Sequence, residues 1–192
     1  MTFDGRSEEV TANAARVRSL ALQNGALDFI ELSDARQCAD IWRVRGALVK
    51  AVEAVSEQEP VDIVVPISRT ADFIRFINDL EARSGMQMVS FGHAGDGNLH
   101  LYICQDGLKD AVWTDVVERV MERLYAQARE LGGEVSGEHG IGHAKRAYLL
   151  ESAGERQIDL MRGIKAVFDP NGILNPCLLY TSPSPRDRSL SR

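Results

Sequence analysis

The chain has 192 residues, 44% of them hydrophobic and 26% charged, which is typical of a globular protein with a hydrophobic core. Its 22 basic and 28 acidic residues give a net charge of -6 and form no basic run, so nucleic acid is not expected as a partner. No apolar stretch approaches the roughly 20 residues that span a bilayer, and the three cysteines lie far apart. A cytoplasmic protein without a membrane span or disulfide framework is predicted.

The first third of the chain is predicted to hold two helices and a short strand. Residues 7–24 follow a helical period and end at an Asn-Gly pair, and residues 27–32 contain Phe and Ile, which favour a strand. Ser33 then begins a long helix that ends before Pro60. The apolar face of this helix carries a single arginine, Arg45.

The middle of the chain alternates strands and helices. A strand is predicted over residues 61–66 and a helix over residues 68–84. Residues 88–94 and 98–105 have strand character and are joined through Gly-Asp-Gly, which is a strong hairpin signal. A third long helix is predicted over residues 108–131.

The last part of the chain is predicted to be helical up to residue 168. Helical turns are expected over residues 143–151 and within residues 155–168, before a turn at residues 169–172. Residues 177–192 show no periodicity and resemble translated sequencing-adapter read-through, so we expect a non-native tail outside the fold. The order of elements predicts an α+β fold, with an antiparallel sheet and flanking helices.

All four histidines of the chain fall in two short glycine-rich stretches, residues 91–100 and 136–143. Histidine is the commonest metal ligand and titrates near neutral pH, and the two stretches also carry Asp96 and Glu138. The clustering therefore predicts a site for metal-assisted or acid-base chemistry.

The first histidine pair depends on the register of the predicted hairpin. If Asp96 and Gly97 form a two-residue loop, His93 lies directly opposite His100, with Cβ atoms about 5 Å apart on one face. The two imidazoles could then share a metal ion. A three-residue loop with a bulge would shift the register by one residue and separate the pair. The alternative is a hairpin that carries two solvated imidazoles.

The second cluster places Glu138 and His139 side by side between glycines, where the backbone can approach a ligand closely. Glu138 would complete a metal-binding set of two histidines and one glutamate, which leaves His139 free to act as a base. The alternative is a glycine-rich lead-in to a helix in which Glu138 is a cap.

Three segments of the sequence resemble one protein family: FGHAGDGNLH at residues 91–100, GGEVSGEHGIGHAKRAYL at residues 132–149, and MRGIKAVFDPNGILNP at residues 161–176. They are similar, in order and spacing, to the C-terminal domain of FAD-linked oxidases of the vanillyl-alcohol-oxidase flavoprotein superfamily. That group holds D-lactate dehydrogenases, glycolate oxidase D subunits and D-2-hydroxyglutarate dehydrogenase. The resemblance covers residues 1–176 and implies a substrate domain with ferredoxin-like elements, truncated at its N-terminal end.

The resemblance also implies a metal site and a base. The family holds a divalent metal, usually zinc, through residues that match His93, His100 and Glu138, and its proton acceptor matches His139. A 2-hydroxy acid would chelate the metal, lose its hydroxyl proton to the histidine and pass a hydride from Cα to the flavin of FAD.

Three further positions match residues near the substrate or the flavin. Arg45 resembles the family's carboxylate-binding arginine, Asn98 matches a residue beside the substrate, and Asn175 matches an asparagine near the flavin. FAD itself would be bound mainly by a separate FAD-binding domain. Some members have a lysine where this chain has Pro60, which weakens the case for hydroxyglutarate.

The leading interpretation is the substrate- and metal-binding domain of an FAD-dependent 2-hydroxy-acid dehydrogenase of D-lactate or glycolate type, inactive on its own. One alternative is a self-sufficient zinc hydrolase that uses the same two histidines and glutamate. Another is a non-catalytic module that binds a flavoprotein or an electron-transfer flavoprotein.

Overall fold

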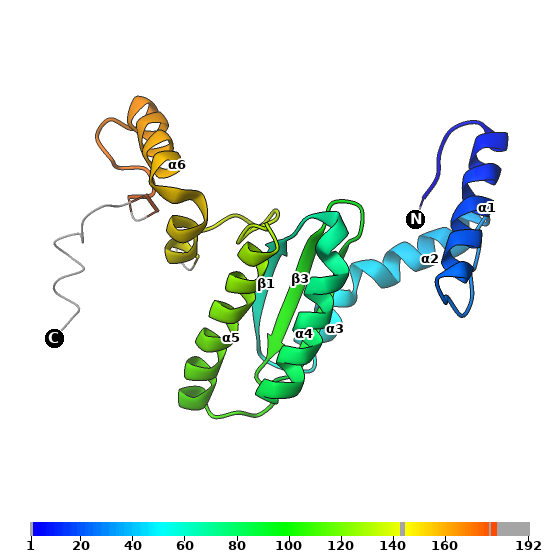
Figure 1. Cartoon of the computed structure of the whole chain (residues 1–192), viewed down its shortest axis with the longest axis horizontal. Coiled ribbons are helices and arrows are strands. Elements are labelled where there is room, and N and C mark those ends of the chain that lie inside the picture. Colours follow the sequence, from blue (N-terminus) through cyan, green and yellow to red (C-terminus); the bar gives the residue numbers. More distant parts are fainter. Residues whose placement is uncertain (1, 143–144, 177, 180–192) are drawn as a thin grey trace. The chain divides into compact units, whose positions relative to one another are not determined.

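The structure is a computed structural model that describes residues 2–142, 145–176 and 178–179 of the chain. The chain divides into two compact units, one up to Lys50 and one from Ala51 onward. Figure 1 labels most of the helices and strands of both units. The tail predicted over residues 177–192 lies outside the described residues, except for two leucines.

The first unit is helical. It contains α1 (Ser7–Gln23), α2 (Ala35–Gly46) and the first turn of α3 (Leu48–Glu53). Asp34, and not the predicted Ser33, caps the start of α2, because its carboxylate accepts hydrogen bonds from the backbone N–H groups of Arg36 and Gln37.

The strand predicted over residues 27–32 is wrong. These residues have no regular secondary structure, Leu27 is fully exposed and Ile30 is 75% exposed. A strand needs a neighbour for its backbone hydrogen bonds, and the described residues of the first unit contain no strand. The long helix predicted after them is also interrupted at Ala47, between α2 and α3.

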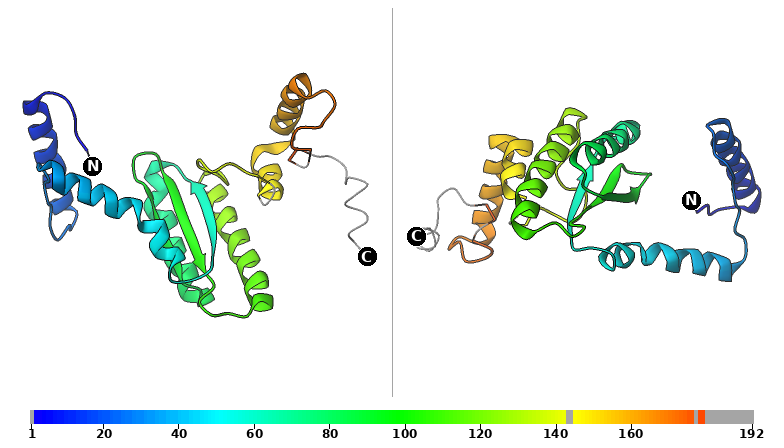
Figure 2. Two further views of the ribbon diagram at one scale, coloured as in Figure 1. Left: turned by 180° about the vertical axis from the view of Figure 1, so that it is seen from behind. Right: turned by 90° about the horizontal axis from the view of Figure 1, so that it is seen from below.

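The second unit is built on a three-stranded antiparallel sheet in the order β1-β3-β2, with β1 at Gln58–Val64, β2 at Met88–His93 and β3 at Asn98–Cys104. Helices α4 (Thr70–Ser84) and α5 (Asp110–Glu130) pack against one face of this sheet, as the views in Figure 2 show. The predicted α+β class, with an antiparallel sheet and flanking helices, is confirmed.

Side chains alternate between the two faces of the sheet because successive residues of a strand point in opposite directions. Val61, Ile63 and Leu101 point towards α4 and α5 and are at most 2% exposed. Asp62 and His100 therefore lie on the opposite face. The two helices contribute these buried residues to the core: Phe73, Ile77, Leu80, Val120, Leu124, Tyr125 and Ala128.

The last helix, α6 (Arg146–Phe168), consists of two helical segments joined at Gly154, whose φ of 73° and ψ of 161° interrupt the helical geometry. Two separate helical stretches were predicted here, although the predicted start at His143 lies outside the described residues. The predicted turn follows α6, since the Gly172 N–H donates to Asp169 O at 3.1 Å. Within the described ranges, no helix combines the length and the apolar character needed to cross a membrane.

Candidate active site

The histidine hairpin closes with a loop of residues 94–97 and not with the predicted two-residue loop. His93 is paired with Asn98, and Phe91 lies opposite His100. The predicted register is therefore wrong by two residues. Because side chains alternate with a period of two, an even shift keeps His93 and His100 on the same face, where their ring centroids are 5.3 Å apart.

The longer loop follows from a contact between Gly97 and the residue that follows β1. The Gly97 N–H donates to His93 O, and Gly97 O accepts from the Val65 N–H. A Cβ atom at Gly97 would lie only 2.0 Å from Val65 O, and the φ of +81° also favours glycine. A rule for local turns takes no account of this third segment, which is why the predicted register fails.

The three predicted metal ligands lie together beside this loop. Glu138 Oε1 is 3.2 Å from His100 Nε2 and 3.6 Å from His93 Nε2. One ligand atom from each of the three residues lies within 4.8 Å of the others. Two imidazole nitrogens and a carboxylate oxygen form a ligand set that suits zinc and leaves a fourth position for substrate or water. The residues present therefore fit a divalent metal.

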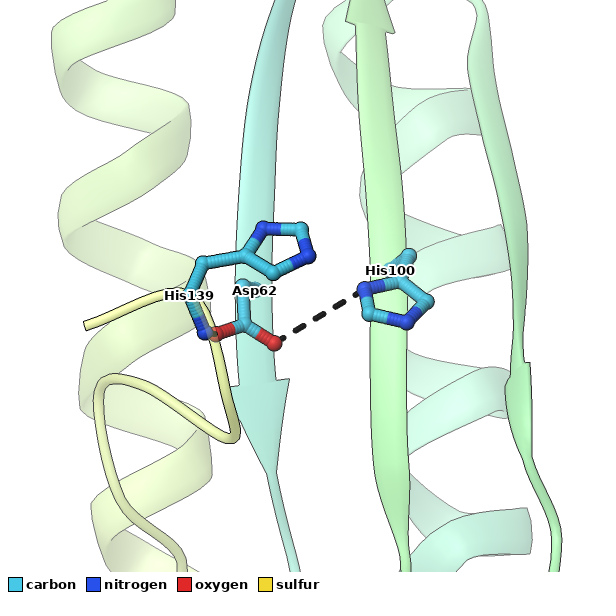
Figure 3. Close-up of side chains that lie close together, drawn as sticks. All are labelled: Asp62, His100 and His139. Atoms are coloured by element: carbon cyan, nitrogen blue, oxygen red, sulfur yellow. Dashed lines mark hydrogen bonds and ion pairs between the residues drawn. The ribbon is translucent and has the colours of Figure 1, made fainter. Parts of the chain in front are cut away.

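A buried carboxylate organises the loop that carries Glu138. Asp62 is 1% exposed, and Figure 3 shows its side chain between His139 and His100. Burial raises the pKa of Asp62, but hydrogen bonds outweigh this effect and lower the pKa to about 2. Oδ2 accepts all of them, at 2.8 to 3.0 Å, from the Ser136 hydroxyl and the backbone N–H groups of Gly137, Glu138 and His139.

Asp62 was not predicted as a site residue, although the sequence contains a signal for it. An acidic residue stands inside the otherwise apolar run Val61-Asp62-Ile63-Val64-Val65. A fully buried aspartate is rare unless it is paired, so this position predicts a partner. The identity of that partner follows only from strand pairing, which places Asp62 directly opposite His100.

His100 lies between two carboxylates and is 8% exposed. Its Nδ1 is 3.7 Å from Asp62 Oδ1, and its Nε2 faces Glu138. Burial is the main cause that lowers the pKa of His100; nearby His139 lowers it further, whereas the two carboxylates raise it. The neutral imidazole that a metal ligand requires is therefore favoured.

His139 stacks on His100, with ring centroids 4.9 Å apart and 15° between the ring planes. Its side chain is 52% exposed, and its Nε2 is 3.9 Å from Glu138 Oε1. A second group of possible ligand atoms is formed by Asp62, His100 and His139. The exposed imidazole is accessible to a substrate, as its predicted role as a base requires.

Asn98, the predicted substrate residue, adjoins the same ligand set. It is 4% exposed and is paired with His93 across the hairpin. Its Oδ1 is buried and has no hydrogen-bond partner among the described residues. Gly137 lies so close that a Cβ atom there would be 2.4 Å from Asn98 Oδ1. The glycine of the second motif therefore allows the loop to approach the hairpin.

The other two predicted site residues belong to different parts of the chain. Arg45 is an exposed residue of α2 in the first unit, where its guanidinium carbon lies 5.4 Å from the centroid of the Trp42 ring. Asn175 follows α6 and has a φ of +46°. The roles proposed for these two residues remain predictions.

Residues 1–179 match the family model of the C-terminal domain of FAD linked oxidases. The chain is 45% identical over 177 residues to a D-lactate dehydrogenase of Anaerostipes hadrus, a match that covers 91% of this chain and 37% of that protein. It is 32% identical over 181 residues to the glycolate oxidase subunit GlcD of Bacillus subtilis, a match that covers 92% of this chain and 38% of that protein. It is 30% identical over 188 residues to a D-2-hydroxyglutarate dehydrogenase of Stutzerimonas stutzeri, a match that covers 95% of this chain and 40% of that protein.

The chain thus spans between 37% and 40% of the length of these relatives. The matched residues include the whole sheet, the histidine hairpin and the loop that carries Glu138 and His139. The family resemblance seen in the sequence motifs is confirmed. On this match, the chain belongs to the family of C-terminal domains of FAD-linked oxidases.

Proposed function

We propose that the chain is the substrate- and metal-binding domain of an FAD-dependent 2-hydroxy-acid dehydrogenase of D-lactate or glycolate type. The observation that carries this proposal is the convergence of His93, His100 and Glu138, whose ligand atoms lie within 4.8 Å of one another. The family and the relatives described as a D-lactate dehydrogenase and a glycolate oxidase subunit support the flavin and the class of substrate.

The proposed chemistry divides the reaction between the cofactors and the side chains. A divalent metal, zinc for this ligand set, supplies Lewis-acid chemistry that lowers the pKa of a substrate hydroxyl, and FAD supplies a hydride acceptor. His93, His100 and Glu138 hold the metal. His139 receives the hydroxyl proton at Nε2, the nitrogen 3.9 Å from Glu138 Oε1. Asn98, paired with His93 across the hairpin, is the proposed substrate-binding residue beside the ligand set.

The remaining roles concern the carboxylate of the substrate, the flavin and the partners. Arg45 binds the substrate carboxylate through paired N–H groups, and Asn175 contacts the flavin. An FAD-binding domain of the same protein holds most of the cofactor, in keeping with the 37% to 40% of the relatives' length that this chain spans. An electron-transfer flavoprotein is a further proposed partner, and the cytoplasm is the proposed location.

Zinc binding by the purified chain tests the ligand set. Calorimetric titration compares the wild type with His93→Ala and with Asp79→Asn, which alters an exposed carboxylate of α4. We expect one zinc per chain in the wild type and in Asp79→Asn, and an affinity lower by on the order of 100-fold in His93→Ala. Equal affinities in all three proteins would refute the ligand set.

Turnover is tested in the protein that joins this chain to its FAD-binding domain. Dye reduction with D-lactate, glycolate and D-2-hydroxyglutarate identifies the substrate. His139→Gln is expected to bind zinc normally and to lose turnover by about 100-fold or more, because the general base is removed. Zinc-dependent ester hydrolysis by the chain alone, without flavin, would instead favour a zinc hydrolase.

A further inference from the structure

We propose that Asp62 is a positioning residue of the site: one carboxylate oxygen fixes the loop that carries Glu138 and His139, and the other orients the imidazole of His100. The consequence for metal binding rests on the proposed function, whereas the effects on the loop and the ring do not. In this assignment Asp62 contacts neither substrate nor metal and acts through the residues that do.

The first oxygen, Oδ2, holds the loop through its backbone. Three consecutive N–H groups, those of residues 137 to 139, point at this single atom from 2.8 to 3.0 Å, and the Ser136 hydroxyl adds a fourth hydrogen bond. A glycine-rich loop has many backbone conformations, so four bonds to one buried anion select one of them. The Glu138 and His139 side chains start from this fixed segment.

The second oxygen, Oδ1, faces His100 Nδ1 at 3.7 Å. Both atoms are buried, and neither has a hydrogen-bond partner in the part of the chain that the structure describes. A buried carboxylate oxygen is stabilised by an N–H donor, and strand pairing puts His100 directly opposite Asp62. Oδ1 therefore favours the His100 tautomer whose proton is on Nδ1.

That tautomer leaves the lone pair on His100 Nε2, the nitrogen that lies 3.2 Å from Glu138 Oε1. The Nε2 lone pair is then available for a metal that His93 and Glu138 also bind. A carboxylate that accepts the other ring N–H of a histidine ligand fixes both its tautomer and its ring orientation. Asp62 therefore positions two of the three proposed ligands, His100 and Glu138, and also the proposed base, His139.

The ring proton of His100 gives a test without metal. In the nitrogen-15-labelled, metal-free chain at about pH 8, where imidazoles are neutral, two-bond proton–nitrogen correlation spectra show which ring nitrogen carries the proton. The His100 signals are assigned by their loss in His100→Ala. Glu138 Oε1, 3.2 Å from Nε2, competes for the same ring proton in the metal-free chain, so the spectra are also recorded on Glu138→Ala, in which Asp62 is the remaining carboxylate beside the ring. We expect the proton on Nδ1 in this variant. A proton on Nε2 in Glu138→Ala would overturn the proposal, and this result needs no variant of Asp62.

Asp62→Asn tests the same point while keeping the shape of the side chain. Its single carbonyl oxygen can stay with the loop, and its NH2 group then faces His100 Nδ1, which must become an acceptor. The ring proton is therefore expected to move to Nε2. Asp79→Asn is the matched control and should leave the proton on Nδ1. If Asp62→Asn lowers the free energy of unfolding but the ring proton stays on Nδ1, Asp62 does not orient His100.

Amide hydrogen exchange tests the loop. In Asp62→Asn we expect the amides of residues 137 to 139 to exchange at least about 10-fold faster, because the oxygen that accepts their hydrogen bonds no longer carries a negative charge. The amides of Leu101 and Ile103 in β3 should keep their wild-type rates. Unchanged exchange in the loop would overturn its assignment to Oδ2.

Zinc titration connects the inference to the proposed function. Asp62→Asn is expected to weaken zinc binding by about 10- to 100-fold, and the same change should cost less in a His100→Ala background, because Asp62 acts partly through His100. Equal losses in both backgrounds would overturn that coupling. If the wild type does not bind zinc, the proposed function fails, while the ring proton and the loop amides still decide the role of Asp62.

Discussion

Asp62 of β1 lies directly opposite His100 of β3, and its two carboxylate oxygens face different parts of the site. Oδ2 accepts the N–H groups of the loop that carries Glu138, and Oδ1 is 3.7 Å from His100 Nδ1. The two histidine motifs are thus joined through a residue that belongs to neither. The geometry of the candidate site depends on the pairing of β1 with β3 as much as on the motifs themselves.

Gly137→Ala is expected to destabilise the chain. The new Cβ atom would lie 2.4 Å from Asn98 Oδ1, and Asn98 has little room to move because it is 4% exposed. Overpacking of this kind costs about 1 to 3 kcal/mol. Denaturant unfolding monitored by circular dichroism measures the loss.

Gly95→Ala is the matched control for this substitution. Gly95 belongs to the first glycine-rich motif, and a Cβ atom there has nothing within 4 Å. Its free energy of unfolding should stay within about 0.5 kcal/mol of the wild type. Asn98→Ala should partly rescue Gly137→Ala because it removes the clashing atoms. Equal stability of the two glycine variants would contradict the close approach of loop and hairpin.

The placement of His93 and His100 on one face of the hairpin could be predicted from the sequence, because it depends on whether the loop has an even number of residues and not on the exact register. His93 and His100 are separated by a turn with an even number of residues, so both the predicted and the observed loop place them on one face. The exact pairing could not be predicted, since it depends on the contact of Gly97 with Val65 O, made across the sheet.

The errors at residues 27–32 and at Asp62 have a common cause. Local composition favours a strand at residues 27–32, but a strand forms only with a partner, and the described residues of the first unit offer none. Composition likewise shows Asp62 as one acid in an apolar run, while its significance comes from the four donors that tertiary folding brings to it. Both outcomes depend on contacts between residues that lie far apart in the sequence.

Zinc is expected to stabilise the folded chain. At a free zinc concentration about 100 times Kd, binding to the folded state adds about 2.7 kcal/mol and raises Tm by about 5 to 10 °C. A chelator should reverse the shift, which differential scanning fluorimetry measures. His100→Ala should show almost no shift, because it removes a ligand of the set. A full shift in that variant would mean that zinc binds at another place.

Tyr125→Phe is expected to stabilise the chain. Tyr125 is 0% exposed, and its hydroxyl has no hydrogen-bond partner among the described residues. An unpaired buried hydroxyl costs about 1 to 3 kcal/mol, so its removal should raise the free energy of unfolding by about 1 kcal/mol. Tyr148→Phe, in the half-buried ring 4.3 Å away, is the control and should change little. A less stable Tyr125→Phe variant would show that the hydroxyl is bonded.

The turn after α6 is expected to become less stable in acid, because the Asp169 carboxylate accepts the hydrogen bonds that hold it. A hydrogen bond from Lys165 is the main cause that lowers the pKa of Asp169; burial opposes it, and the N–H groups of Leu174 and Ile173 lower it further. A pKa lower in the folded than in the unfolded chain means that this stabilisation is complete above the ordinary carboxyl pKa of about 3.9. It is lost as the pH falls through the lower, folded value.

Hydrogen exchange of the Ile173 and Leu174 amides, corrected for the intrinsic rate at each pH, measures this loss between about pH 5 and pH 2. In Asp169→Asn both amides should exchange faster at pH 5 and show no further change in acid, because the titrating group is gone. Asp159→Asn, which removes an exposed carboxylate of α6, is the control and should keep the wild-type profile. Equal protection of both amides in the wild type and in Asp169→Asn at pH 5 would contradict the assignment, since the Asp169 carboxylate would then not hold this turn.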